Sequence, residues 1–133
     1  MSIADIKAGL AANLGTVSGL RVSTDVPDQI NVPMAVLELN SVNYDQAFQQ
    51  GMTQYNFTIS LFVARASERN AQRKLDAYAD TGASGIKDAV QSDRTLGGAA
   101  YDVRVVDMSN ISAVSLGEVS YLAADFTVSV YAD

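Results

Sequence analysis

The feature that most constrains the fold is a run of alternating side chains near the middle of the chain. From Gln54 to Val63 the odd positions are apolar and most even positions are polar. Successive side chains of a strand point to opposite faces of a sheet, so this run predicts a strand with one face in the core. The other face should meet water or a partner. A second alternating run, from Tyr121 to Val130, predicts another long strand.

Helical spacing of apolar residues predicts three helices. The first spans about Ser2 to Leu14, with Ser2 as its N-cap. The second is capped by Ser67 and presents one apolar stripe, formed by Ala71, Leu75, Tyr78 and Ala79. The third is short, carries Ile86, Ala89 and Val90, and is followed by a stop at Gly97-Gly98. These helices should pin their apolar stripes to the sheet.

Three further strands are predicted at 20–23, 34–39 and 101–105, whereas the residues from there to Gly117 look less regular. The order is therefore helix, three strands, two helices, two strands. Strands joined directly to strands favour antiparallel pairing, and so few helices cover mainly one face of a sheet. We expect an α+β fold in a single domain over residues 1–133, with one mostly antiparallel or mixed sheet and the helices packed on one face.

The composition excludes several classes of function. The chain has no Cys and no His, which removes disulfides, thiolate zinc sites and any Ser-His-Asp triad. The net charge of −6 and the pI near 4.4 argue against a protein that wraps nucleic acid. No segment is apolar enough to span a bilayer, and no secretory signal is visible. We expect no cofactor and no membrane contact. The composition leaves an Asp-only hydrolase or a Ser-Lys pair open, although neither has a signature in this chain.

Two motifs could carry chemistry, and each has a simpler interpretation. Asp76 and Asp80 are spaced i, i+4 and could hold a divalent cation, although a solvated helix face with an Arg73–Asp76 pair explains them as well. The segment Thr95–Gly98 could be imagined as a phosphate loop. It lacks the Walker lysine and precedes a strand, so a turn is favoured. We therefore expect no metal site.

Arg65, Arg69 and Arg73 repeat every four residues. If the second helix begins at Ser67, Arg69 and Arg73 share one of its faces, and Arg65 lies just before it. Such a stripe could meet an acidic neighbour or a phosphate. The alternative is a solubilising face opposite the apolar stripe. We name the three arginines as candidate interface residues.

A long polar connection, Asn40 to Met52, separates two strong strands and contains Tyr44, Phe48 and Met52. Hairpins usually close in two to five residues, so a longer connection is a candidate for binding a partner. A strand extension with a wide turn, or disorder, would explain the segment equally well. Tyr44, Phe48 and Met52 complete the set of candidate partner residues.

Several phrases of the chain resemble the tail terminator (tail completion) family of long-tailed bacteriophages. In order they are VPDQINVPMAVLEL, which begins at Val26, LFVAR, LDAYAD, GIKDAVQSDRTLGG, YDVRVVD and YLAADFTVSVYAD. The resemblance covers most of the chain from about Val32 onward. The similarity lies in the order of elements and in phrases such as DRTLGG. Head-closure and adaptor proteins of the phage neck have similar size and composition, so they remain the alternative.

The resemblance implies a structural protein without catalytic residues. Members of the family form a ring, commonly a hexamer, at the head-proximal end of the tail tube. The ring stops tube polymerisation and presents the surface that docks to the filled head. The implied partners are other copies of the chain, the tail tube protein and the head–tail connector proteins, and DNA passes through the lumen without specific binding. The implied location is the virion tail, after assembly in the host cytoplasm.

Overall fold

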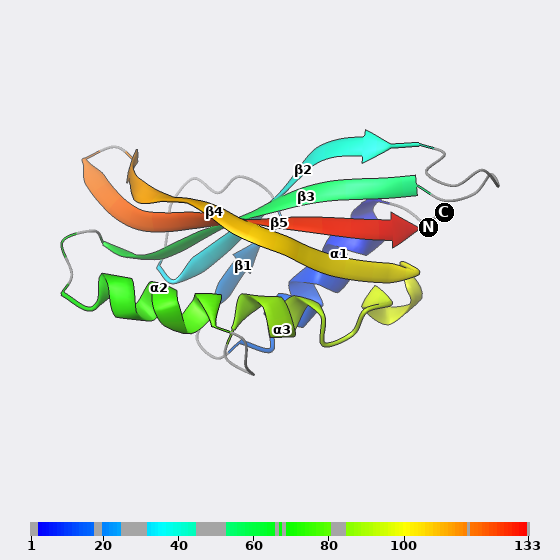
Figure 1. Cartoon of the computed structure of the whole chain (residues 1–133), viewed down its shortest axis with the longest axis horizontal. Coiled ribbons are helices and arrows are strands. Elements are labelled where there is room, and N and C mark those ends of the chain that lie inside the picture. The colour runs from blue at the N-terminus through cyan, green and yellow to red at the C-terminus, as the bar shows by residue number, and fades with distance from the viewer. Residues whose placement is uncertain are drawn as a thin grey trace.

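The computed structural model describes residues 3–17, 20–24, 32–44, 53–65, 67, 69–80, 85–116 and 118–132. The described elements are α1 (Ile3–Leu14), β1 (Arg21–Ser23), β2 (Met34–Asn43), β3 (Thr53–Arg65), α2 (Ala71–Ala79), α3 (Ile86–Val90), the 3-10 turn η1 (Leu96–Gly98), β4 (Asp102–Leu116) and β5 (Val119–Ala132) (Figure 1). This order confirms the predicted α+β class.

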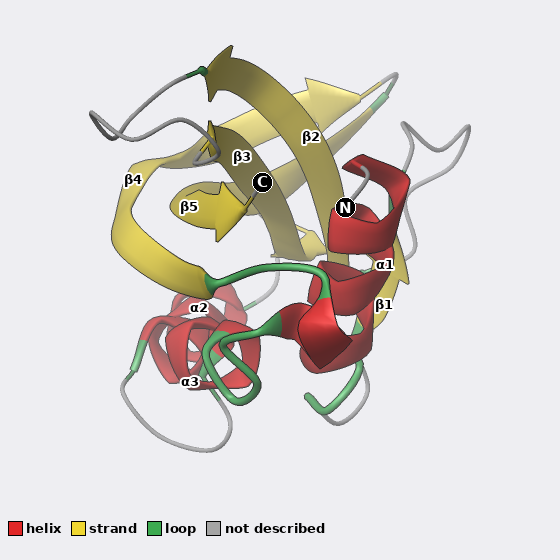
Figure 2. Cartoon of the chain, turned by 90° about the vertical axis from the view of Figure 1, so that its right-hand side faces the viewer, coloured by secondary structure: helices red, strands yellow, loops and turns green. Residues whose placement is uncertain are grey.

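The strands form one mixed sheet in the order β1-β2-β3-β5-β4. β1 runs parallel to β2, and the other neighbours pair antiparallel. The three helices share a single hydrophobic core with one face of this sheet, as predicted (Figure 2). The opposite face carries no helix, and β4 forms one edge.

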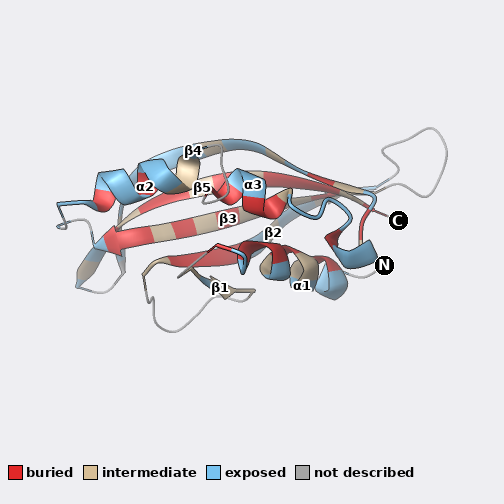
Figure 3. Cartoon of the chain, turned by 90° about the horizontal axis from the view of Figure 1, so that it is seen from below, coloured by how far each residue is buried: buried red, intermediate tan, exposed pale blue. Residues whose placement is uncertain are grey.

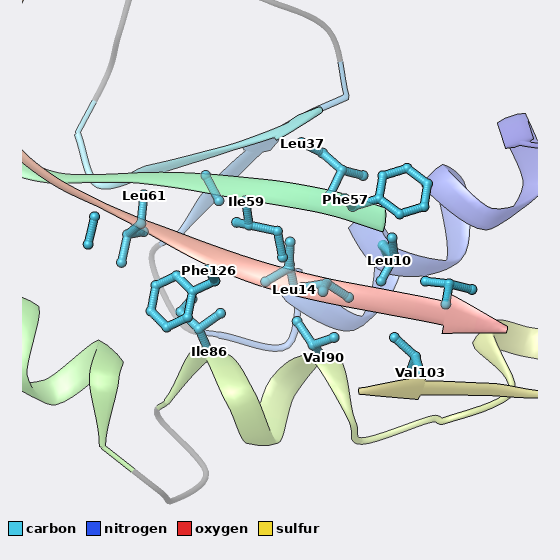
Figure 4. Close-up of a cluster of buried hydrophobic side chains, with 14 of the residues drawn as sticks. Leu10, Leu14, Leu37, Phe57, Ile59, Leu61, Ile86, Val90, Val103 and Phe126 are labelled. Atoms are coloured by element: carbon cyan, nitrogen blue, oxygen red, sulfur yellow. The ribbon is translucent and has the colours of Figure 1, made fainter. Parts of the chain in front are cut away.

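The core lies between the central strands and the helices, and both predicted alternations are confirmed there (Figure 4). The odd positions of β3 from Tyr55 to Val63 are buried. Phe57, Ile59 and Leu61 pair across the sheet with Val128, Phe126 and Ala124 of β5, which are buried too. The helices contribute the fully buried side chains of Ile6, Leu10, Leu14, Leu75, Ile86 and Val90. Figure 3 shows these buried positions along the strands and the inner sides of the helices.

The segment from α3 to η1 is fixed against α1. The side chain of Asn13, only 7% exposed, donates hydrogen bonds to the carbonyl oxygens of Val90 at 2.8 Å and Asp93 at 2.9 Å. A Cβ on Gly9 would lie 2.6 Å from the Cβ of Leu96, so a glycine is needed where α1 crosses the turn. Gly97 has φ +69, which glycine adopts without strain.

The predicted turn at Thr95–Gly98 is confirmed. The carboxylate of Asp93 accepts hydrogen bonds from the backbone amides of Thr95 (3.2 Å) and Gly97 (2.9 Å), and from the Thr95 hydroxyl (2.8 Å). These bonds, led by the one from the hydroxyl, lower the pKa of Asp93. The two amides that a phosphate would use are therefore occupied by the protein's own carboxylate.

The predicted start of the second helix is wrong. α2 begins at Ala71, not at Ser67, and its N-cap position, Asn70, makes no side-chain capping hydrogen bond. β3 continues to Arg65, so the residues that follow are needed to turn the chain back over the sheet. The predicted cap of the first helix, Ser2, lies outside the described residues.

Two predicted strands prove longer than expected. β2 continues to Asn43, and β4 continues to Leu116 through the stretch that looked irregular. Each carries β-bulges, between Leu39 and Ser41 in β2 and at two places in β4. A bulge inserts an extra residue and shifts the period of two, so the alternation disappears from the sequence although the strand continues.

We expect Leu75→Asp to unfold the domain. Leu75 is 1% exposed, and even its truncation to Ala would cost about 2–5 kcal/mol, to which the aspartate adds a buried charge. The matched control is Ala77→Asp, which adds the same charge on the exposed side of α2. Thermal melts followed by circular dichroism should show loss of the transition in the first variant only. Equal melting temperatures would contradict the packing of α2.

Candidate assembly surface

One part of the helix-free face of the sheet, formed by the end of β2, the start of β3 and the end of β5, is a network of polar side chains, whereas Met34, Val36, Tyr121 and Ala123 at its other end are buried. Gln54 donates to the side-chain oxygens of Asn56 at 3.0 Å and Ser129 at 3.2 Å. Ser129 donates to Asn56 at 3.2 Å, and Asn56 donates to Ser41 on β2 at 3.0 Å. Asn40 also donates to Thr58. The side-chain amides and hydroxyls of this face thus bind one another across three strands.

The same network reaches the edge strand β4. The carboxylate of Asp125 accepts hydrogen bonds from Ser60 on β3 and Asn110 on β4, both at 3.1 Å. Asn110 lies in the second bulge of β4 and has φ +57, a conformation that asparagine tolerates better than most residues. The bulge therefore bends β4 while one polar contact ties it to β5.

The first half of the β4 edge is protected by side chains. The backbone amide of Val103 donates to the carboxylate of Asp102 at 2.9 Å. The amide of Val105 donates to Oε1 of Gln91, which follows α3, at 3.0 Å. Bonds of this kind satisfy amides that an approaching strand would otherwise pair with. This half of the edge is blocked by the chain itself.

A polar groove of about 560 Å³ accompanies this protected half. It is lined by Lys87, Gln91, Arg94, Asp102, Arg104, Val105 and Val106. Arg94 and Asp102 form an ion pair with Nε and Oδ1 2.7 Å apart and Nη2 and Oδ2 3.2 Å apart. The hydrogen bond from Arg94 is the main reason why the pKa of Asp102 is lowered. The groove concentrates positive charge in an acidic protein.

The second half of the β4 edge, from Asp107 to Leu116, is different. No residue from Asp107 to Ser115 is buried. The sequence from Met108 to Leu116 has no charged residue and no proline, the two features with which proteins usually discourage strand pairing. Large apolar side chains are exposed at Val106 (60%) and Ile111 (49%). This half of the edge is therefore open to a partner strand.

The three predicted interface arginines lie on separate elements. Arg65 ends β3, Arg69 precedes α2 and Arg73 lies within α2, and all three are exposed. Because α2 begins at Ala71, Arg69 is not on the helix, and the expectation that it shares a helix face with Arg73 is wrong. Asp76, the expected partner of Arg73, accepts a hydrogen bond from Gln72 at 3.1 Å.

The predicted interaction loop is shorter than expected, because its first residues belong to β2. This agrees with the alternative of a strand extension. Tyr44 follows β2 directly, and its side chain is 74% exposed. Phe48 and Met52 lie outside the described residues. Of this group, only Tyr44 can be placed, at the end of the β2 edge.

The acidic pairs do not gather into a site. Within the described ranges, no group of three or more acidic residues is arranged to hold a metal ion. Asp76 and Asp80 are both exposed on or beside α2, as the simpler interpretation predicts. None of the helices described is long and apolar enough to cross a membrane.

The sequence analysis missed the residues of the β4 edge and its groove, above all Val106, Ile111, Arg94 and Arg104. A signal was present. Val105-Val106 breaks the alternation of β4, placing an apolar residue where a polar one is due. The uncharged run after Asp107 was also visible, but it was taken for a connection between strands.

Comparison with known proteins adds no relative: no protein-family model matches the chain, and no curated protein matches it.

The Arg94–Asp102 ion pair predicts a pH dependence. The folded-state pKa of Asp102 lies below its unfolded value, so its contribution is present above the unfolded pKa and is lost as pH falls through the folded pKa. The acid-induced drop in melting temperature between pH 6 and pH 3 should be smaller in Asp102→Asn than in the parent protein. Asp88→Asn, an exposed carboxylate on α3, is the control. An equal reduction in both variants would contradict a specific role for the ion pair.

Proposed function

We propose that this protein is a structural subunit that assembles into a ring at the head-proximal end of a phage tail, as tail terminators do. The observation that carries the proposal is the second half of β4, which has no buried residue from Asp107 to Ser115 and no charged residue after Asp107, at the edge of an otherwise well-packed domain. Edges of this kind are usually covered or charged unless a partner covers them. The phrases shared with tail terminators, from Val32 onward, support the same function.

The surface suits assembly better than catalysis. The polar residues of the helix-free face are hydrogen-bonded to one another, so they form a flat wall and not a pocket with converging free groups. The depression of about 570 Å³ beside α1 is lined partly by Asp93, whose carboxylate is already used by the η1 turn. This surface offers a partner shape complementarity and hydrogen bonds, and not a reactive group.

In the proposed ring, the helix-free face lines the lumen. Strand register places four carboxylates on this face, those of Glu38, Asp102, Asp107 and Asp125, and three guanidinium groups, those of Arg21, Arg65 and Arg104. Asp102 is ion-paired with Arg94, so this face is close to neutral, whereas the chain as a whole has a net charge of −6. A wall of hydrogen-bonded polar side chains on a protein of net negative charge offers the phosphate backbone little to bind, so DNA passes without sticking. The tail tube protein and the head–tail connector would contact the two rims of the ring.

The proposal predicts a closed oligomer. Negative-stain microscopy should show rings, and native mass spectrometry should give a mass near six subunits, at high protein concentration if the contacts are weak. Added tail tubes should carry the ring at one end. A strict monomer that also fails to bind tail tubes would refute the proposed function.

The alternative is another ring of the phage neck, a head-closure or adaptor protein, for which the same edges and charge would serve. Antibody labelling of assembled tails separates the two. A terminator should be found at the head-proximal end of isolated tails that have never joined a head. Label found only on heads would favour the neck alternative.

The exposed arginines near α2 provide a test of a charged seam between subunits. Arg69→Glu combined with Arg73→Glu should leave the melting curve intact, because both residues are exposed, but should weaken oligomerisation by placing acids against an acidic neighbour. Arg69→Lys with Arg73→Lys keeps the charge and is the control. Unchanged rings in the glutamate variant would exclude these arginines from the seam.

A further inference from the structure

We propose that neighbouring copies join by extending the sheet: the free half of β4, Asp107–Leu116, pairs antiparallel with the β2 segment Leu37–Asn43 of the next copy. This inference deepens the proposed ring assembly and rests on it. In this arrangement, backbone hydrogen bonds between the β4 edge and the β2 edge hold neighbouring copies together. The arginines near α2 can add to this contact but are not required for it.

The β2 edge is free over its second part. β1 is short and pairs only with Met34–Val36 of β2. From Leu37 to Asn43, β2 is paired with β3 on one side, and among the described residues no strand pairs with it on the other. Tyr44, at its end, is 74% exposed. In the part of the chain that the structure describes, the sheet therefore has two unpaired edge segments, one on β2 and one on β4.

The two open segments lie at opposite ends of the sheet. Register places Leu37 level with Ile59, Phe126 and Met108, one row across the four strands. It also places Asn43 level with Asp102. The free part of β2 beyond Glu38 is thus level with the protected half of β4, and Ser109–Ser112 of β4 is level with Met34–Val36, the part of β2 that β1 covers. The two open segments are level with each other only in the rows of Leu37 and Glu38.

Strand direction allows the two segments to pair between copies. β2 and β4 run in opposite directions, because three antiparallel pairings separate them. A second copy placed beside β4 in the same orientation therefore presents its β2 antiparallel to β4. Such a contact joins two different surfaces, which is the heterologous arrangement that a ring needs.

The offset between the segments is compatible with closure. Their centres differ by about six residues along the strand direction, or roughly 20 Å at 3.3 Å per residue. Four strands at about 4.8 Å spacing contribute roughly 19 Å per copy across the sheet. The strands would then tilt by about 45° from the ring axis, close to the 35–45° at which sheets close into barrels.

The composition of the edges favours a second copy as the occupant. Each paired segment contains one acidic residue, Glu38 near the start of one and Asp107 at the start of the other. In an antiparallel pair these two carboxylates lie at opposite ends of the contact, so no like charges are placed together. Exposed apolar side chains flank both, at Tyr44 on one edge and at Val106 and Ile111 on the other. Pairing of β4 with β4 would also be antiparallel, but it would leave the β2 edge open on both copies.

Cysteine cross-linking tests the pairing without background, because the chain has no cysteine. Ser41 and Ser112 are exposed, and register places both on the helix-free face. The doubly substituted protein, Ser41→Cys with Ser112→Cys, is treated with a short bismaleimide, which tolerates a shift of one or two residues. We expect a ladder of covalent oligomers on a denaturing gel that extends to the full ring.

Three controls test whether the ladder reports a specific contact between Ser41 and Ser112. Each single variant, Ser41→Cys or Ser112→Cys, should remain monomeric on the gel. Ser41→Cys with Ala77→Cys, which moves one thiol to the exposed side of α2, should not form the ladder. Circular dichroism melts of all variants confirm that they fold.

The outcomes separate the inference from the function on which it rests. Rings seen by native mass spectrometry without a cross-linked ladder would overturn the edge pairing and leave the proposed function standing. A covalent dimer from Ser112→Cys alone would show β4–β4 pairing and overturn the inference as well. Cross-linking only between this chain and added tail tube protein would assign the edge to that partner. A monomer that binds no tail tubes would refute both proposals.

Discussion

The structure depends on the pairing of β3 with β5 under a layer of helices. Both strands alternate so strictly that the inner face must be buried, and three helices supply the apolar surface that buries it. The same alternation makes one part of the outer face polar, whereas Met34, Val36, Tyr121 and Ala123 on that face are buried. α3 contacts β4, whereas α2 contacts β3 and β5, and no residue of β4 from Asp107 to Ser115 is buried. The edge strand is thus the least covered part of the sheet.

Much of the fold can be predicted from the sequence, because in the centre of the fold the spacing of the apolar residues matches the positions that are buried. The helical stripe at Leu75 and the strand at Phe57 are read directly, and both are buried as expected. The failures lie where the chain departs from a single period. The bulge before Ser112 interrupts the alternation, so the second half of β4 is not recognised as a strand in the sequence. The predicted cap at Ser67 is wrong because β3 is long and α2 begins later, at Ala71.

The candidate site was harder to predict than the fold. An edge strand is defined by what does not pair with it, and pairing is set by residues far away in the sequence. Gln91 illustrates this, because its side chain accepts a hydrogen bond from the amide of Val105, fourteen residues later. No pattern in the local sequence predicts this contact. Charged residues attract attention in a sequence, whereas the uncharged run after Asp107 looks like a linker. Such a run is informative once it is known to be a strand at an edge.

The division of each edge into a blocked and an open part restricts how copies can meet. A fully open edge would pair in many registers and with many partners, which leads to fibres or aggregates. Here Asp102 and Gln91 close one half of β4, and β1 closes the first part of β2. Only a staggered neighbour can then satisfy both open segments, and a stagger repeated around an axis tilts the strands as closure requires. In the proposed ring, the side chains that protect the edge of the monomer would therefore also select the geometry of assembly.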